Sequence, residues 1–244
     1  MILNEDFKRY SRVRDVGRWY VTRFVQDVAA ALPAGTRVLD AGAGECAYKP
    51  FFNHCRYTAV DLAVGESRWT YRNLDSIATL DQLPFADAGF DAVLNTQTLE
   101  HLRRPAESVQ EFYRVLRPGG TLYLSAPMAH MEHQQPYDFF RYTSFGLREL
   151  AERAGFAAGD VRVEAFGGMF TRWGYELPHA LNVMPYSGIP QRQYNARGIA
   201  LLPVKAVLFG FIRLTQLLLF ALDRFDKKRD YPFGWSMIAV KAAH

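Results

Sequence analysis

The chain has 244 residues, of which 49% are hydrophobic and 22% are charged, a composition typical of a folded globular protein and not of a disordered one. Its two cysteines exclude a disulfide scaffold and offer no metal-ligand spacing, which favours a reducing cytoplasm. The first residues, Met-Ile-Leu-Asn-Glu-Asp, contain acids and no apolar core, so no signal peptide is expected.

Apolar residues recur about every helical turn near the start of the chain, which predicts a helix over residues 6–32. Strands and helices then alternate, which predicts a mostly parallel sheet with helices on both faces. Expected strands are residues 37–41, 57–62, 70–74, 90–95, 121–126, 160–165 and 235–241. Expected helices are residues 47–53, 105–116 and 145–154, and Pro118-Gly-Gly is interpreted as a stop before the fifth strand.

A long segment, residues 167–230, precedes the last expected strand. Residues 198–222 within it are strongly apolar and helical in pattern, although Pro203 and two cations argue against a simple membrane span. Eight basic residues against two acids give residues 191–229 a charge of +6. This charge fits either a solvated face or a nearby anionic surface, and the helix fits a membrane surface, a lid or a homodimer contact.

A glycine turn follows the first expected strand, in Val38-Leu-Asp-Ala-Gly-Ala-Gly44. Glycine permits unusual torsions and close approach of a ligand to the backbone, although Gly-x-Gly also occurs in purely structural turns. Asp61 closes the next strand, where a carboxylate can accept both hydroxyls of a ribose. Asp40, inside the turn, would repel a pyrophosphate and suits a cofactor with an amino group and a positively charged sulfur.

These residues, with several later stretches, resemble the class I S-adenosylmethionine-dependent methyltransferases of type 11. The matching stretches are residues 38–44, Asp61, and residues 83–91, 98–101 and 115–120. The resemblance covers roughly residues 35–128. It implies an α/β fold with a Rossmann-like, doubly wound, seven-stranded mixed sheet whose last strand is antiparallel, and it implies S-adenosyl-L-methionine as cofactor. The expected organisation is an N-terminal helical cap (1–34), a cofactor-binding core (35–166), a helical insertion or lid (167–230) and a final core strand (231–244).

The resemblance also implies site roles. Gly42 and Gly44 would shape the methionine end, Asp40 would sit beside its ammonium group, and Asp61 would hold the ribose. The full set implied for the cofactor is Asp40, Gly42, Gly44, Asp61, Leu62, Thr79, Leu80, Asn95, Thr96 and Gln97. Thr79 stands where the family usually has an acid for the adenine amino group, and Asp81 or Asp75 could substitute for it. Glu100 and His101 are interpreted as helix-start and packing residues.

A polar loop follows the fifth expected strand, in residues 130–143, and two histidines, two acids, an arginine and two tyrosines make it a candidate active site. Its pattern His-x-x-Pro-Tyr-Asp-Phe-x-Arg-Tyr-Thr resembles a bacterial subgroup of the family. We expect His133 to act as general base, Asp138 to orient it, and Arg141 to hold an anionic or hydroxylated substrate. In the alternative interpretation, Asp138 and Arg141 only pin the loop, and Thr143 or Ser144 caps the next helix. A metal site of His130, His133 and Asp138 is the third alternative, but none is expected because nothing in the sequence fixes its geometry.

The sequence therefore predicts a small-molecule methyltransferase, acting most plausibly on an oxygen of a sugar, a lipid-linked saccharide or a secondary metabolite. The alternative is a protein of the same fold with a non-methylating reaction or a scaffold role. No nucleic-acid partner is expected, because no basic stripe interleaved with aromatic residues occurs. The expected location is the cytoplasm, with peripheral contact to the inner face of the membrane through residues 198–229. Tyr10, Arg12 and Arg14 are candidates to cap the cofactor.

Overall fold

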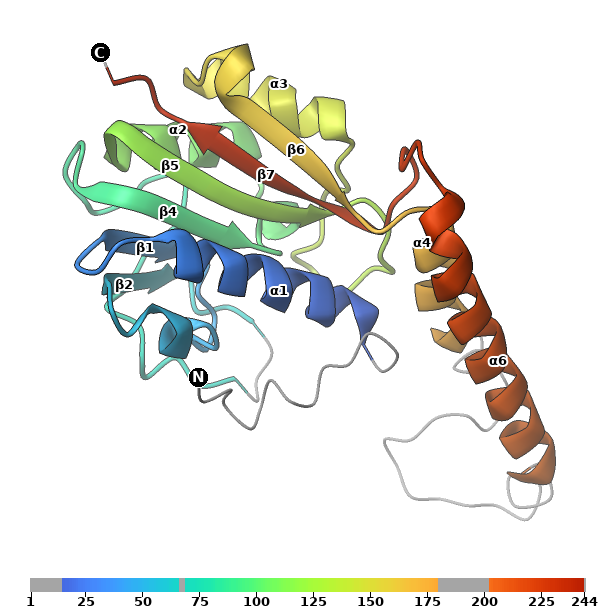
Figure 1. Cartoon of the computed structure of the whole chain (residues 1–244). Helices are drawn as coiled ribbons and strands as arrows, with labels where there is room; N and C mark the ends of the chain where they lie inside the picture. The colour runs from blue at the N-terminus through green and yellow to red at the C-terminus, as the bar shows by residue number, and fades with distance from the viewer. Residues whose placement is uncertain (1–14, 66–68, 180–201, 244) are drawn as a thin grey trace.

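The computed structural model describes residues 15–65, 69–179 and 202–243 (Figure 1). Its centre is one seven-stranded sheet with the order β3-β2-β1-β4-β5-β7-β6, in which β7 runs antiparallel to both of its neighbours. The strands are β1 (Arg37–Ala41), β2 (Arg56–Asp61), β3 (Ser76–Ile77), β4 (Phe90–Thr96), β5 (Leu116–Pro127), β6 (Val161–Phe166) and β7 (Gly234–Val240). The predicted mixed sheet with an antiparallel last strand is thereby confirmed.

Helices cover both faces of the sheet, as Figure 1 shows. The α-helices are α1 (Val16–Ala31), α2 (Pro105–Val115), α3 (Ser144–Ala154), α4 (Met169–Glu176) and α6 (Leu202–Leu222). Short 3-10 helices are η2 (Lys49–Phe52), η3 (Leu99–His101), η4 (Ala158–Asp160) and η6 (Asp223–Phe225). Val25 of α1 packs against one face with Val38 and Leu94, and Phe112 of α2 and Leu147 of α3 pack against the other.

Local hydrogen bonds explain where several elements begin. Asp15 caps α1, because its Oδ1 accepts from the Arg18 amide at 2.9 Å, so the helix starts at Val16; residues 6–14 of the expected helix lie outside the described residues. Thr143 caps α3 through the Gly146 amide at 3.1 Å, which confirms one of the two caps proposed for that helix.

Two expectations from local pattern are wrong. Residues 70–74 form no strand, because Leu74 closes a turn by donating to the Tyr71 carbonyl, and the third strand is Ser76–Ile77. The Pro118-Gly-Gly stretch is expected to separate a helix from the fifth strand, but it lies inside β5. Gly119 donates to the Lys241 carbonyl and Lys241 donates to the Gly120 carbonyl, so pairing with the segment after β7 overrides the turn signal.

Helix α6 docks on α4 along one narrow stripe and leaves most of its apolar surface exposed. Ile212, Gln216 and Phe220 are buried in that stripe, and Gln216 Nε2 donates to the Gly174 carbonyl at 2.8 Å. Among the described residues, Pro203–Phe225 is the one helical segment long and apolar enough to cross a membrane by length and composition. An 18-residue window in it has a mean hydropathy of 1.7, and 11% of that window is buried. Figure 1 shows the helix extending away from the sheet.

Asp91, at the start of β4, joins two strands through arginine contacts. Its Oδ2 accepts from the Arg37 amide at 2.8 Å and from Arg37 Nε at 3.1 Å, and its Oδ1 pairs with Arg117. Burial opposes ionisation, but the hydrogen bonds from Arg37 and Arg117 outweigh it and hold the pKa of Asp91 well below its usual range. A depressed folded-state pKa stabilises the fold above the unfolded pKa of about 4 and loses that effect as pH falls through the folded value.

We therefore expect Asp91→Asn to lower the free energy of unfolding at pH 7, with the difference from wild type shrinking as pH falls below about 4. Urea unfolding at several pH values measures this difference. Asp27→Asn is the matched control, since Asp27 forms only an exposed ion pair with Arg23 on α1. A difference for Asp91→Asn that does not change with pH would contradict the prediction.

Candidate active site

A cavity of about 550 Å³ opens at the carboxyl ends of β1, β2 and β4. Its floor begins with the glycine turn after β1, in which Gly42 and Gly44 have φ angles of +88° and +52°. Asp61, at the end of β2, closes this turn because its Oδ2 accepts from the Gly44 amide at 2.9 Å and its Oδ1 from the Ala63 amide at 2.8 Å. Parallel strands place both segments at one edge of the sheet, where such folds bind ligands.

Most residues expected to bind the cofactor line this one cavity. They are Gly42, Gly44, Asp61, Leu62, Thr79, Leu80, Thr96 and Gln97. Asp81 also lies in the wall and forms an ion pair with Arg104, whereas Asp75 lies outside it and accepts from the Ala59 amide at 2.8 Å. Of the two proposed substitutes for an acid at Thr79, only Asp81 therefore faces the cavity.

Asp40 and Asn95, which are expected to bind the cofactor, are buried beside the cavity and do not line it. The carboxylate of Asp40 is buried and accepts from the Tyr57 hydroxyl. Burial raises the pKa of Asp40 to about 7, and the hydrogen bond from Tyr57 opposes that rise. Asn95 is fully buried and its Nδ2 donates to the Ala41 carbonyl at 2.7 Å, which ties β4 to the glycine turn.

The loop of residues 130–143 is pinned to η3, the short helix that follows β4. The Phe139 amide donates to the Glu100 carbonyl at 2.9 Å, and the Tyr142 hydroxyl donates to the Leu99 carbonyl at 3.0 Å. His101 Nδ1 lies at hydrogen-bond distance from the Tyr137 carbonyl. These bonds bring the loop histidines, His130 and His133, against η3 at the edge of the cavity.

Arg141 is wrongly expected to hold the substrate. Its Nη1 and Nη2 contact the two carboxylate oxygens of Asp138 at 2.6 and 2.8 Å, and its remaining hydrogen bonds go to the carbonyls of His130, Met131 and Phe140. All five of its donors therefore have partners inside the loop. Arg141 does not line the cavity, so the alternative interpretation, that it pins the loop with Asp138, describes the structure.

His133 lies in the cavity wall with Asp138 behind it. Its Nδ1 is 3.3 Å from Asp138 Oδ2 and 3.1 Å from the Met131 carbonyl, and its amide donates to the same carboxylate at 2.9 Å. Burial, followed by the neighbouring His130 and His101, lowers the pKa of His133. The imidazole is thus held neutral, with Asp138 at its Nδ1 side.

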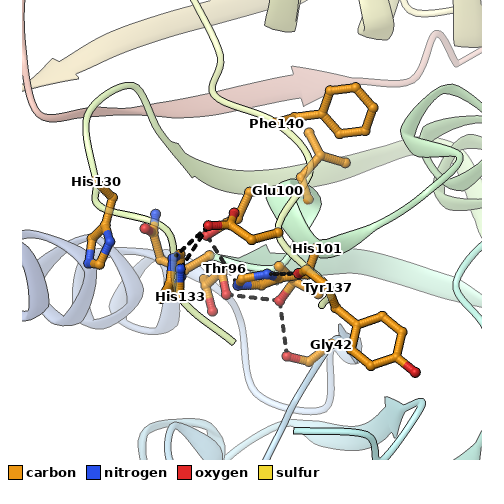
Figure 2. Close-up of polar contacts among 12 residues, drawn as sticks. Gly42, Thr96, Glu100, His101, His130, His133, Tyr137 and Phe140 are labelled. Atoms are coloured by element: carbon orange, nitrogen blue, oxygen red, sulfur yellow. Dashed lines mark hydrogen bonds and ion pairs between the residues drawn. The ribbon is translucent and has the colours of Figure 1, made fainter. Parts of the chain in front are cut away.

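Glu100 and His101, interpreted from the sequence as helix-start and packing residues, line the cavity beside His133. Figure 2 shows Glu100, His101 and His133 gathered next to Thr96 and Gly42. Glu100 is only 1% exposed, and burial raises its pKa to about 8. Their position directly after β4, beside the expected Thr96 and Gln97, is the sequence signal that could have identified them.

Other parts of the wall come from segments far apart in the chain. Gly17, Arg18 and Val21 of α1, Tyr175 of α4 and Phe233 before β7 line the cavity. The expected caps Tyr10, Arg12 and Arg14 lie outside the described residues. Tyr175 thus brings one aromatic side chain of the 167–230 segment to the cavity wall.

Residues 39–124 match the family model described as methyltransferase domain, Methyltransf_11. A probable S-adenosylmethionine-dependent methyltransferase of Mycolicibacterium smegmatis is 33% identical over 140 residues, covering 52% of this chain and 54% of that protein. A demethylmenaquinone methyltransferase of Renibacterium salmoninarum is 35% identical over 141 residues, covering 54% and 56%. The chain thus spans about half the length of these curated relatives.

Similarity to solved structures extends over nearly the whole chain. The crystal structure of a SAM-dependent methyltransferase from Archaeoglobus fulgidus superposes with a TM-score of 0.56 at 16% identity, covering 98% of this chain and all of that one. At this identity the match establishes the shared fold, which includes the segments on either side of the family match.

Proposed function

We propose that the whole chain is an S-adenosylmethionine-dependent methyltransferase acting on a small molecule, because residues 39–124 match the methyltransferase-domain model. The observation that carries this proposal is the shared cavity. Gly42, Gly44, Asp61 and His133 all line this one cavity, so cofactor and acceptor can meet in the same space. Methyl transfer needs this arrangement, since the acceptor atom must lie in line with the methyl–sulfur bond.

The cofactor is proposed to lie across the carboxyl ends of β1 and β2. The two Asp61 oxygens each accept one backbone hydrogen bond and keep further lone pairs for the ribose hydroxyls. Leu62 and Leu80 offer apolar surface for the adenine, with Thr79 and Asp81 as polar partners at its edge. The methionine end is assigned to Gly42, Thr96 and Gln97.

The test of this function is calorimetric titration of the full chain with S-adenosylmethionine and, separately, with its demethylated product. We expect one site for each ligand. Labelled cofactor supplied with fractionated cell extracts then identifies the class of acceptor from the fraction that becomes labelled. A chain that binds neither ligand is not a methyltransferase. A chain that binds both but labels no fraction supports the alternative of a non-methylating reaction or a scaffold role.

For the acceptor we propose an oxygen of a sugar, a lipid-linked saccharide or a secondary metabolite. A hydroxyl loses its proton during transfer, and His133, a neutral imidazole with Asp138 at its Nδ1, is placed to assist that loss. We expect His133→Gln to lower kcat by about 100-fold or more. Its affinity for S-adenosylmethionine should stay within a few-fold of wild type, because the ribose and adenine contacts are elsewhere. Unchanged turnover would remove His133 from the reaction.

We also propose that α6 rests on an anionic membrane surface. Val207, Phe211, Leu214 and Leu218 are 58–73% exposed and share one face of the helix, opposite the stripe that docks on α4. Beyond the helix, Arg224, Lys227, Lys228 and Arg229 are exposed. Two nearby acids point inward, since Asp223 accepts from the Gly168 and Thr171 amides and Asp226 from the Met169 amide. An exposed apolar face beside exposed cations matches an anionic leaflet.

Co-sedimentation of the full chain with phosphatidylglycerol-containing vesicles tests this surface. We expect binding that weakens at high salt and is lost in the double variant Phe211→Glu, Leu218→Glu. Phe145→Glu is the matched control, because Phe145 is 81% exposed on α3 and lies outside the face. If the wild-type chain does not co-sediment with the vesicles, the membrane proposal is contradicted. It is also contradicted if the double substitution only converts a homodimer to a monomer, and that result assigns the face to a second copy of the chain.

A further inference from the structure

The cavity wall contains a cluster that the proposed cofactor site does not use. Glu100, His101 and His133 each present one ligand atom to the others, and these atoms all lie within 4.8 Å of one another. They come from two segments, η3 and the loop after β5, which hydrogen bonds from the Phe139 amide and the Tyr142 hydroxyl hold together. Nitrogen and carboxylate oxygen in this combination are ligands for divalent transition metals.

The two histidines are oriented as metal-binding histidines are. His101 has the Tyr137 carbonyl at Nδ1, so Nδ1 is the donor and Nε2 keeps its lone pair. That Nε2 is buried and has no hydrogen-bond partner among the described residues. His133 has the Met131 carbonyl and Asp138 at Nδ1, which likewise leaves Nε2 as the lone-pair atom. In metal sites a carbonyl or carboxylate at the second ring nitrogen orients the imidazole in this way.

Glu100 supplies the third independent observation. Its side chain is 1% exposed, and its Oε2 has no hydrogen-bond partner within the described chain. His101 Nε2 is 3.8 Å from Glu100 Oε1, which is too long for a hydrogen bond that would satisfy either group. A buried polar atom without a partner is destabilising, so two of them aimed at one space indicate a ligand there.

We propose that Glu100, His101 and His133 bind one divalent transition-metal ion of the zinc class. Two histidines and one glutamate are a known ligand set for zinc sites that keep a coordination position open. Metal–ligand bonds of about 2.1 Å place tetrahedral ligands about 3.4 Å apart, so the three side chains must close slightly around the ion. The open position faces the cavity that these residues line.

The metal would act on the acceptor of the methyl group. Only this role in the reaction rests on the proposed function. An acceptor hydroxyl at the open position would lose its proton more readily, because the cation stabilises the oxyanion. His133 Nε2 would then serve as a ligand and could not also accept the proton, which would pass to solvent water in the cavity instead. Metal binding itself does not depend on S-adenosylmethionine.

The test titrates untagged, chelator-treated full chain with Zn²⁺ by calorimetry and with Co²⁺ by visible absorption. We expect one equivalent of either ion to bind, with a cobalt spectrum typical of mixed nitrogen and oxygen ligands at low coordination number. Mg²⁺ should not compete, because it prefers all-oxygen, octahedral sites. Glu100→Gln and His133→Gln should each weaken Zn²⁺ binding by more than about 100-fold, the upper range for loss of a mere supporting contact.

His54→Gln is the matched control, since the His54 ring contacts the Leu32 carbonyl and the residue lies outside the cavity. Circular dichroism and the S-adenosylmethionine titration on the same samples show whether each variant is folded. No stoichiometric Zn²⁺ or Co²⁺ binding by the wild type, or equal binding by His54→Gln and His133→Gln, overturns the metal site and leaves the methyltransferase proposal standing. Metal binding without cofactor binding overturns the proposed function and leaves the metal site.

Discussion

Gly42→Ala should abolish binding of S-adenosylmethionine. It should also lower the free energy of unfolding more than Gly44→Ala, the other glycine-to-alanine change in the turn. Residue 42 has φ of +88°, where a side chain is strained, and a Cβ there would lie 2.4 Å from Thr98 Cγ2 and 2.5 Å from Thr98 Oγ1. Thr98 cannot easily move, because its hydroxyl bonds the Thr96 carbonyl at 3.0 Å and contacts the Gly42 carbonyl at 3.3 Å. Strain and overpacking each cost about 1–3 kcal/mol.

Gly35→Ala separates the two causes. Residue 35 has φ of +81°, and nothing lies within 4 Å of its added Cβ. It should therefore show only the backbone strain of about 1–3 kcal/mol and leave cofactor affinity unchanged. Urea unfolding and calorimetry of both variants measure the comparison. If the two substitutions cost the same and both proteins bind cofactor equally, close packing at Gly42 does not shape the site.

Asp61→Ala should weaken binding of S-adenosylmethionine by roughly 100-fold or more. The variant loses a charged acceptor for two ribose hydroxyls, and a hydrogen bond to a charged group contributes about 1.5–3 kcal/mol. It also releases the Gly44 and Ala63 amides, which the carboxylate holds at 2.9 and 2.8 Å. Asp61→Asn keeps one acceptor oxygen and should lie between wild type and alanine.

Asp75→Ala is the matched control for Asp61. Asp75 precedes β3 and accepts from the Ala59 amide at 2.8 Å, but it does not line the cavity. Its loss should lower the free energy of unfolding without changing cofactor affinity. Calorimetry with the demethylated product measures both variants without turnover. Equal affinities for Asp61→Ala and wild type would show that the ribose is bound elsewhere.

Much of the cavity wall around the glycine turn could be predicted from the sequence, because its signals are local. A buried strand that ends in a glycine turn, followed by a second strand that ends in Asp61, places both segments at one sheet edge whatever the rest of the chain does. The alternation of elements likewise implied the sheet, and β7 was located although a long segment precedes it. The predicted strand at residues 70–74 and the predicted break at Pro118-Gly-Gly were wrong, because turn formation and strand pairing overrode the local sequence pattern there.

The tertiary structure decided which side chains face the cavity. Asp40 and Asn95 lie near strand ends as expected. Their side chains, however, form hydrogen bonds with the Tyr57 hydroxyl and the Ala41 carbonyl and do not line the cavity. Arg141 has the chemistry of a substrate-binding residue, yet Asp138 and the loop carbonyls occupy all of its donors. Such partners are chosen by how the loop folds back, which spacing along the chain does not encode.

By itself, then, the sequence determined the family-like core, the glycine turn and Asp61, since each depends on backbone geometry over a few residues. The meeting of Glu100 and His101 with His133 was decided only by tertiary structure. Those residues are separated along the chain and become neighbours because the 130–143 loop bonds to η3. The free face of α6 was decided in the same way, since only docking on α4 shows which of its apolar residues stay exposed.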